Sequence, residues 1–511
     1  MKKIFNCIFL MLLFYKGNAQ EYRRNENWII GFWPAIVFNF NGPLLIDTLP
    51  NVSATYQASC ISDTNGKFLC YMNGFNLVNK NGQPVQDGTY LNCPYGTVWR
   101  NYSGGTTPWD QNSIIIPKKN NQYYVFSTGM SDSVATNYIN HIKTEFDVLN
   151  YAVVDMDLNG GLGKVIEKNK VIVDHQHYVN AAMTAVKHAN GKDWWLIKTD
   201  CTFHRYQEYL VREDSILGPF YLPISDTGDF CFGFGQIYFS EDGKQLASGI
   251  YIGKDSNGAY SRNRLDLYDF DRCDGHLQFK KYYMVPYDLT TYPDFDIKAG
   301  QCFSPNGRYL YVSNSYTVYQ IDLLDTNTYN AQFIHGPDTS DLSHFPLYSH
   351  ISLAPDGRLY IGNFNGTRKY MSYIEYPDSQ GTACHFVPLG VSQPFSNNLL
   401  DPPNMPNYGL GPDNSKICWP LQQSESGEQQ SEWVVYPNPA DAFIAIDLDH
   451  SYTANSTFKL FDFLGREVLQ TTLSAGSNYT RLDIHSIPEG IYLYQIVAEG
   501  NKLQTGKLII E

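Results

Sequence analysis

The sequence is poor in charge, and basic residues are scarcer than acidic ones. Charged side chains make up 17% of its 511 residues, and 37 Lys and Arg face 51 Asp and Glu, which gives a net charge of −14. No run of Lys or Arg forms a patch that would neutralise phosphate groups, so we do not expect nucleic acid as a partner. After the first 20 positions the chain also lacks an apolar run of roughly 20 residues, so we expect no transmembrane segment in the mature chain.

The usual catalytic signatures are missing as well. The sequence contains no Gly-x-Ser-x-Gly elbow, no His-Glu-x-x-His, no phosphate-binding glycine loop and no nucleotide-binding fingerprint. None of its 10 cysteines forms a Cys-x-x-Cys pair, which argues against zinc and iron–sulfur sites. We therefore assign no catalytic, cofactor-binding or metal-binding residue. Enzymes that use dispersed carboxylates carry no such signature.

Tyrosine, glycine and turn-forming residues are abundant instead. The chain has 39 Tyr, 40 Gly and 26 Pro, and hydrophobic residues make up 43% of it. This composition is typical of many short strands joined by tight turns. It predicts an all-β protein, and the length predicts more than one domain.

The N-terminus has the features of an export signal. Lys2 and Lys3 precede an apolar run that ends at Tyr15, and Gly17 and Ala19 are the small residues that signal peptidase requires. We predict that residues 1–19 are removed between Ala19 and Gln20. Cleavage removes three lysines and no acidic residue, so the mature net charge is −17.

Export to an oxidising compartment favours structural disulfides. Nine cysteines remain after cleavage. Cys60 and Cys70 flank the turn sequence SDTNGK symmetrically, and Cys273 and Cys302 fall in neighbouring strand units. We predict these two pairs as disulfides. The alternative is that they are buried free thiols, which pack as small hydrophobic side chains.

A hairpin unit recurs along the chain. Each copy has an apolar strand, in most copies a turn with Asn-Gly or Asp-Gly, and a second alternating strand, as tight hairpins require. The copies lie at 60–74, 113–129, 183–199, 237–249, 302–314 and 351–363. Further strands fit the intervals, at 149–158, 206–214, 264–272, 317–324 and 371–377.

Four strands in every 40–60 residues or so are typical of a propeller blade. We predict that residues 20–418 form a six- or seven-bladed β-propeller of WD40-like or YVTN-like repeats. A seventh blade would join N-terminal strands near 28–40 to a C-terminal strand near 384–410. Motifs such as NYAVVDMDLNGGLGKV, CFSPNGRYLYVSN and PPNMPNYGLGP resemble those of a family of secreted propeller-like proteins of Bacteroidetes. This resemblance covers residues 28–418 and implies no particular activity.

The C-terminal part reads as a separate module. Residues 419–432 are rich in Ser, Gln and Glu and predict a linker. Residues 433–511 contain about seven short strand patterns, which predict a small immunoglobulin-like β-sandwich. The segments YPNPA, LFDFLGREV, IPEGIYLYQI and GKLIIE resemble the type A sorting domain of the type IX secretion system. That resemblance implies export to the cell surface or the medium through the periplasm, with the secretion machinery as partner, and it marks as motif residues Tyr436, Pro437, Asn438, Pro439, Gly465, Gly490, Tyr492 and Lys507.

Two polar segments are weak candidates for ion binding. Asp155, Asp157 and Asn159 match the first half of a calcium loop, but its last position would be Ile166 instead of Glu. A polar turn explains this segment more simply, so we predict no cofactor and keep calcium as the alternative. His175 and His177 would share one face of a possible strand, but no third ligand is evident nearby.

These observations predict an exported, non-enzymatic binding or adhesion protein whose propeller loops contact an extracellular glycan or protein. The alternatives are a propeller hydrolase or lyase that acts on polysaccharide, and a structural component of the cell surface. Turnover of a polymer separates the first two hypotheses.

Overall fold

The fold is known from a computed structural model of the chain. It describes residues 21–31, 35–49, 57–103, 110–141, 145–178, 181–200, 205–223, 235–251, 263–286, 299–314, 316–326, 330–336, 347–363, 369–393, 401–413, 415, 418, 433–448, 455–462, 466–475, 479–498 and 501–510. The predicted signal peptide with its cleavage site at Ala19 and Gln20, the predicted linker 419–432 and Gly465 lie outside these residues.

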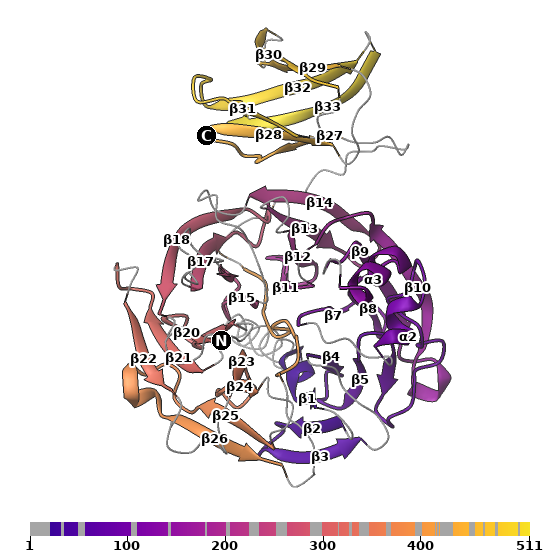
Figure 1. Ribbon diagram of the computed structural model, residues 1–511, viewed down its shortest axis with the longest axis vertical. Coiled ribbons are helices and arrows are strands. Elements are labelled where there is room, and N and C mark those ends of the chain that lie inside the picture. Colours follow the sequence, from indigo (N-terminus) through magenta and orange to yellow (C-terminus); the bar gives the residue numbers. More distant parts are fainter. Residues whose placement is uncertain are drawn as a thin grey trace, which may run out of the picture. The chain divides into compact units, whose positions relative to one another are not determined.

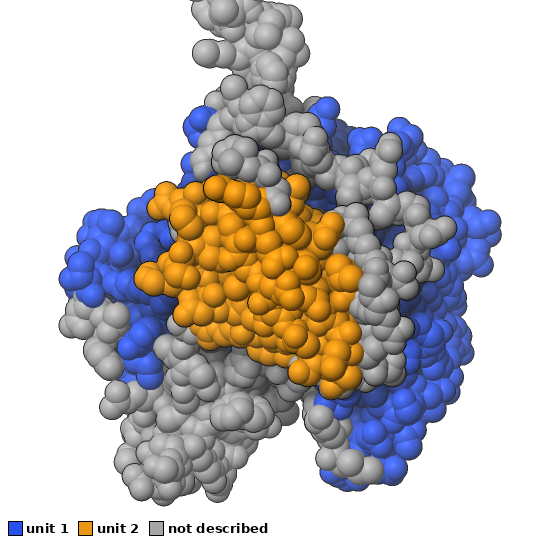
Figure 2. Space-filling view, turned by 90° about the horizontal axis from the view of Figure 1, so that it is seen from above, with its two compact units in different colours: residues 1–218, 224–419 blue, residues 219–223, 420–511 orange. Residues whose placement is uncertain are grey.

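The chain divides into two compact units, which Figure 2 shows in different colours. Residues 1–218 and 224–419 form the first unit, and residues 219–223 and 420–511 form the second. Each unit has its own hydrophobic core among the described residues.

Seven antiparallel sheets form a closed ring in the first unit (Figure 1). Two of them have three strands, namely β1 (Asn27–Ile30), β2 (Ala35–Asn39) and β3 (Leu45–Leu49) in the first, and β4 (Ser59–Ser62), β5 (Phe68–Met72) and β6 (Leu77–Asn79) in the second. The third and fourth sheets have four strands each, β7 (Ser113–Pro117), β8 (Gln122–Gly129), β9 (Val148–Asp155) and β10 (Lys164–Val173), then β11 (Met183–Lys187), β12 (Trp194–Asp200), β13 (Arg205–Val211) and β14 (Ile216–Pro223).

The last three sheets also have four strands. They comprise β15 (Ile237–Phe239), β16 (Gln245–Tyr251), β17 (Asn263–Phe270) and β18 (Leu277–Val285); β19 (Ala299–Phe303), β20 (Tyr309–Asn314), β21 (Thr317–Asp322) and β22 (Ala331–His335); and β23 (Tyr348–Leu353), β24 (Leu359–Asn363), β25 (Tyr370–Ile374) and β26 (Phe386–Ser392). The first unit is therefore a seven-bladed β-propeller.

All six hairpins predicted from the sequence are present, as the first two strands of the second to seventh sheets. Their turns explain why the sequence signal was clear. Gly66, Gly243, Gly307 and Gly357 have φ between 69° and 80°, a region that an L-residue with a side chain adopts at a cost. The five further predicted strands correspond to β9, β13, β17, β21 and β25.

The predicted closure of the ring is wrong. The strands at 27–49 form a sheet by themselves, and β26 pairs with β25 in the last sheet instead of joining them. Apolar packing closes the ring: Trp28, Ile36 and Phe38 of the first sheet share a core cluster with Tyr360 and Met371 of the last. Side-chain burial between sheets thus replaces the backbone hydrogen bonds that we expected there.

Two short helices lie in the third blade and in the segment before it. They are α2 (Val98–Tyr102) and α3 (Asp132–Ile139). Ser131 caps α3, because its hydroxyl accepts a hydrogen bond from the Val134 N–H. A separate core cluster that includes Trp99 and Ala135 holds both helices against the blade. Within the residues that the structure covers, neither helix nor any other is long and apolar enough to cross a membrane.

The second unit is the predicted small β-sandwich. One sheet has the order β27 (Trp433–Tyr436), β28 (Phe443–Leu448), β31 (Tyr479–Asp483), and the other β30 (Glu467–Leu473), β29 (Ser456–Phe461), β32 (Gly490–Ala498), β33 (Asn501–Ile510). Ile444, Ile446, Phe458 and Ile496 are fully buried between the sheets. Phe458 and Ile496 alternate with more exposed residues along their strands, as a two-sheet sandwich requires.

Both predicted disulfides are wrong. Cys273 is bonded to Cys418, while Cys302, Cys60 and Cys70 are free and buried. In the β4–β5 hairpin Cys60 faces Tyr71 and Ile61 faces Cys70, so the two thiols are one position out of register. An offset of one residue places them on opposite faces of the sheet, where each packs in a different core cluster. Cys302 lies on β19 with its side chain in the core, whereas Cys273 lies in the β17–β18 turn.

Candidate functional site

The axis of the propeller is occupied by the segment 401–413. β1, β4, β7, β11, β15, β19 and β23 are the innermost strands, and from β1 to β23 each contacts the next along the chain. Asn404 donates through Nδ2 to the carbonyl oxygens of Ser113 (2.9 Å) and Met183 (3.1 Å), which belong to β7 and β11. Tyr408 donates to the Ile115 carbonyl oxygen at 2.7 Å. The segment is thus hydrogen-bonded to several blades from inside the ring.

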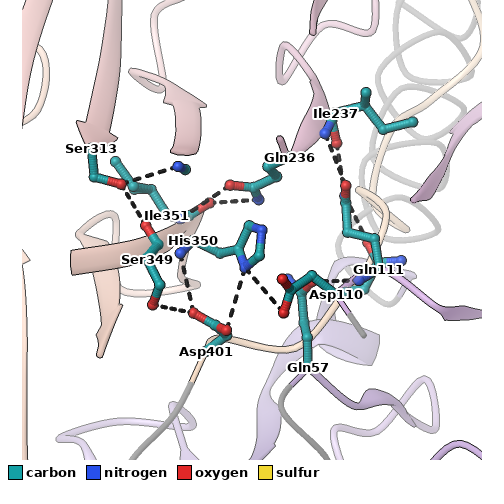
Figure 3. A network of polar contacts seen from close by, with 12 residues as sticks. Gln57, Asp110, Gln111, Gln236, Ile237, Ser313, Ser349, His350, Ile351 and Asp401 are labelled. Carbon is teal, nitrogen blue, oxygen red and sulfur yellow. Dashed lines mark hydrogen bonds and ion pairs between the residues drawn. The ribbon is translucent and has the colours of Figure 1, made fainter. Parts of the chain in front are cut away.

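A network of glutamines crosses the axis near the start of the innermost strands (Figure 3). Gln111 donates to the carbonyl oxygen of Ile237 and accepts from its N–H, both at 2.8 Å. Gln236 accepts from the N–H groups of Gln301 (3.0 Å) and Ile351 (3.1 Å) and donates to the Ile351 carbonyl oxygen at 2.9 Å. The Gln111–Ile237 and Gln236–Ile351 bonds join blades that are not neighbours, so side-chain amides fill this part of the axis.

Three ionisable residues converge beside this network. His350 belongs to β23, Asp110 precedes β7, and Asp401 begins the axial segment. Nδ1 of His350 lies 3.4 Å from Oδ2 of Asp401 and 3.9 Å from Oδ1 of Asp110 (Figure 3). The exposed fractions of His350, Asp401 and Asp110 are 0%, 1% and 9%. We refer to these three residues as the axial cluster.

The sequence analysis missed the axial cluster, although one signal was present. His350 stands seven residues before the turn glycine Gly357, as Gln236 stands seven residues before Gly243. The two residues therefore occupy equivalent positions of the repeat. In the last blade a histidine thus replaces the glutamine that hydrogen-bonds across the axis from the fifth blade. The fold is needed to show that Asp110 and Asp401 lie next to this histidine.

A second polar feature lies at the other ends of the innermost strands. A solvent-open pocket is lined by Trp28, Tyr238, Glu241, Met405 and other residues. Burial raises the pKa of Glu241 to about 7, and the neighbouring Asp242 carboxylate acts in the same direction. The carboxylate accepts a hydrogen bond of 3.0 Å from Asn407. Glu241 is therefore a pocket residue that titrates near neutral pH, a property common at functional sites.

Three exposed tyrosines lie on the segment that carries α2. Tyr90, Tyr95 and Tyr102 are 43%, 43% and 57% exposed. The Arg100 guanidinium lies 4.0 Å from the centre of the Tyr90 ring, and the Tyr95 hydroxyl donates to Asp174. The Trp99 ring, 5.7 Å from Tyr102 between centroids, is buried beneath. We call Tyr90, Tyr95 and Tyr102 the tyrosine patch.

The ion-binding segments considered from the sequence behave as local structure. In the β9–β10 turn Asp155 accepts from the Asp157 N–H and from Gln122, both at 3.0 Å. These bonds form the polar turn that the sequence predicts here. His175 and His177 do not share a strand face, because β10 ends at Val173 and His175 has a φ of 55°.

The motif residues of the second unit cluster around its last strands. Asn438 donates to the Lys507 carbonyl oxygen at 2.7 Å and accepts from the Ile509 N–H at 2.8 Å. This side chain therefore ties the Pro437–Pro439 segment to β33. Tyr492 on β32 is buried and donates to the Pro488 carbonyl oxygen at 2.7 Å. Tyr436 ends β27 and is buried, and Gly490 begins β32.

Sequence comparison identifies this unit. Residues 434–511 match the family described as the secretion system C-terminal sorting domain. The chain carries a type IX sorting domain. The resemblance stated from the YPNPA and GKLIIE segments is confirmed, and the protein is exported to the cell surface or secreted.

Other comparisons say less about the propeller. No curated protein matches the chain in sequence. Among solved structures, it is similar to a proposed 6-phosphogluconolactonase from Bacteroides uniformis, with 12% identity and a TM-score of 0.41 over 74% of this chain and 98% of that one. A proposed 6-phosphogluconolactonase from Bacteroides fragilis gives 12% identity and 0.42 over 75% and 97%. Likenesses this distant carry no argument about activity.

Proposed function

We propose that the propeller is a binding module for an extracellular glycan, displayed or released after type IX secretion, and that it does not turn its ligand over. The tyrosine patch is the observation that supports this proposal. Tyrosine offers a flat apolar ring for stacking on a sugar and a polar tip for hydrogen bonds. Three such rings are exposed within thirteen residues of one segment.

Hydrogen bonds hold the segment of the tyrosine patch in place, which favours a role of the patch in ligand binding. The Tyr90 carbonyl oxygen accepts from Asn169 at 3.0 Å, and the Asp132 carboxylate accepts from the Val98 N–H at 2.8 Å. These contacts fix the segment that carries the tyrosines. Binding to a preorganised surface loses less conformational entropy than binding to a mobile one. Because the whole chain is acidic, we propose a neutral glycan as the ligand.

A glycan array probed with the purified chain tests the proposal, together with an assay for released reducing sugars. We expect binding without release of sugar. The triple variant Tyr90→Ala, Tyr95→Ala, Tyr102→Ala should lose roughly tenfold or more in affinity, the scale of truncated aromatic anchors. Tyr376→Ala is the matched control, since Tyr376 is 55% exposed elsewhere on the propeller. Equal binding by the triple variant, or no glycan bound at all, contradicts the proposal.

The alternative, a polysaccharide hydrolase or lyase, draws support from one observation. Asp110 and Asp401 bring two carboxylates to one imidazole, and paired carboxylates perform glycoside hydrolysis. The reducing-sugar assay decides between the two functions. Turnover that disappears in Asp110→Asn and persists in the tyrosine variant favours the enzyme.

A further inference from the structure

We propose that the axial cluster, Asp110, His350 and Asp401, binds one divalent transition-metal ion of the zinc class. The proposal concerns a site separate from the tyrosine patch and goes beyond glycan binding. One nitrogen and two oxygen ligand atoms, each from a different residue, lie within 4.8 Å of one another. Asp110 and Asp401 are 291 positions apart in the sequence. An ion here would therefore join distant parts of the ring.

The distances fit ligands that share an ion. Zinc binds imidazole and carboxylate at about 2.0–2.2 Å, so two ligands of a tetrahedral ion are roughly 3.3–3.6 Å apart. His350 Nδ1 and Asp401 Oδ2 are 3.4 Å apart, and Asp110 Oδ1 is 3.9 Å from the same nitrogen. A direct charge-assisted hydrogen bond would be about 2.7–2.9 Å. Both distances exceed that range and approach the separation of ligands around a common ion.

The charge of the cluster also favours a cation. Two carboxylates and one imidazole lie together in a site that is nine-tenths or more shielded from water. Buried carboxylates in proteins are paired with other groups or coordinate a metal ion. A divalent ion bound by a neutral imidazole balances both carboxylates.

The surroundings orient the ligands as metal sites do. Oδ1 of Asp401 accepts hydrogen bonds from the Ser349 hydroxyl and, at 3.1 Å, from the His350 N–H. These bonds hold the carboxylate so that Oδ2 faces the imidazole. Hydrogen bonds to a ligating carboxylate of this kind tune affinity in known metal sites. Ser349 is therefore a positioning residue for the ion.

The donor set selects the class of ion. Calcium and magnesium prefer all-oxygen sites, whereas an imidazole suits zinc, copper, iron and nickel. Three protein ligands leave a further coordination position for water. Because Asp401 begins the axial segment, binding would fix that segment to β23 and to the chain before β7. An ion that binds the folded state and not the unfolded state raises the stability of the folded chain.

The test uses the purified full chain, stripped with a chelator and titrated with ZnCl2, MnCl2 and CaCl2. We expect one zinc per chain, a higher melting temperature with zinc than with calcium, and reversal by chelator. His350→Gln and Asp401→Asn should abolish stoichiometric binding, and Ser349→Ala should weaken it roughly tenfold. Glu375→Gln is the matched control, because Glu375 pairs with His385 at 2.5 Å on the propeller surface; it should bind zinc as the unaltered chain does.

A second measurement keeps the proposal falsifiable if an axial variant fails to fold. Cobalt(II) bound to the unaltered chain should show the visible absorption of a four-coordinate nitrogen–oxygen site, at one ion per chain. Absence of binding, zinc binding that survives His350→Gln, or cobalt without this spectrum overturns the proposal. Calcium that stabilises the chain as much as zinc, with the same dependence on Asp401, overturns the assignment to the zinc class.

Discussion

Gln111 and Ile237 are 126 residues apart in the sequence and exchange two hydrogen bonds of 2.8 Å across the propeller axis. The Gln111 side chain hydrogen-bonds both the N–H and the C=O of Ile237, as a neighbouring strand would. The two residues nevertheless belong to the third and fifth blades. Both residues are buried. The two bonds therefore link blades that share no sheet, and removing them should destabilise the whole ring.

Gln111→Ala should lower the free energy of unfolding by about 2–3 kcal/mol, because it leaves the buried N–H and C=O of Ile237 without this partner. Denaturant titration of the full chain measures the change. Gln278→Ala is the control, since Gln278 is exposed on β18; we expect a change within about 0.5 kcal/mol there. Equal midpoints for the two variants would show that the cross-axis bonds contribute nothing.

The Cys273–Cys418 disulfide should stabilise the propeller. It connects the β17–β18 turn to the chain that follows the axial segment, over a sequence separation of 145 residues. Cys273→Ser should cost about 2–5 kcal/mol, the usual range for a native disulfide. Peptide mapping under non-reducing conditions should recover the Cys273–Cys418 pair. Cys93→Ser serves as control, because Cys93 is a free, partly buried thiol, and recovery of a Cys273–Cys302 or Cys60–Cys70 pair would refute the assignment.

Glu241 should make stability depend on pH. Its pKa is raised from 4.5 to about 7 in the folded chain. A raised carboxyl pKa stabilises the fold fully below about pH 4.5, and this stabilisation is lost as the pH rises through about 7. The free energy of unfolding of the unaltered chain should fall by on the order of 2 kcal/mol between pH 5 and pH 8. Glu241→Gln should remove this fall.

Chemical unfolding at the two pH values checks the Glu241 prediction. Glu213→Gln is the control, because the Glu213 side chain is 57% exposed, and it should keep the pH profile of the unaltered chain. A Glu241→Gln profile that parallels the unaltered one would contradict the assignment.

Export should depend on the second unit. Deleting residues 433–511 removes the sorting domain, and we expect the propeller to accumulate in the periplasm. Cell fractionation measures the distribution, and a fusion of residues 433–511 to an unrelated passenger provides the complementary control. Asn438→Ala should reduce export without abolishing folding, because it removes the two bonds that tie the Pro437–Pro439 segment to β33. Surface display of the deleted chain at the normal level would falsify the dependence.

Local features of the chain were well predicted where a few adjacent residues decide the backbone. The Asp-Gly turn at Gly357 and the alternating strand after it specify a hairpin regardless of the rest of the chain. A single side chain can act in the same local way: in the β11–β12 turn, Nδ1 of His188 accepts a hydrogen bond from the Asn190 N–H at 2.9 Å.

Features that depend on distant segments were not predictable in this way. The partner of Cys273 depends on where residues 401–418 run after leaving the last blade, and no short motif encodes that path. The prediction of how the ring closes was wrong for a related reason. Trp28 and Tyr360 pack across the seam with ring centroids 5.8 Å apart, and apolar packing has no sequence signature comparable to a turn.

The strands, the turns and the type IX sorting domain could be predicted from the sequence, because each depends on a short pattern that acts locally or is recognised as a unit. The three-dimensional packing was needed to show that seven sheets close without a shared strand, that residues 401–413 fill the axis, and that Asp110, His350 and Asp401 meet there. Those outcomes require side chains far apart in the chain to be buried together, and long-range burial is set by the packing of the whole ring.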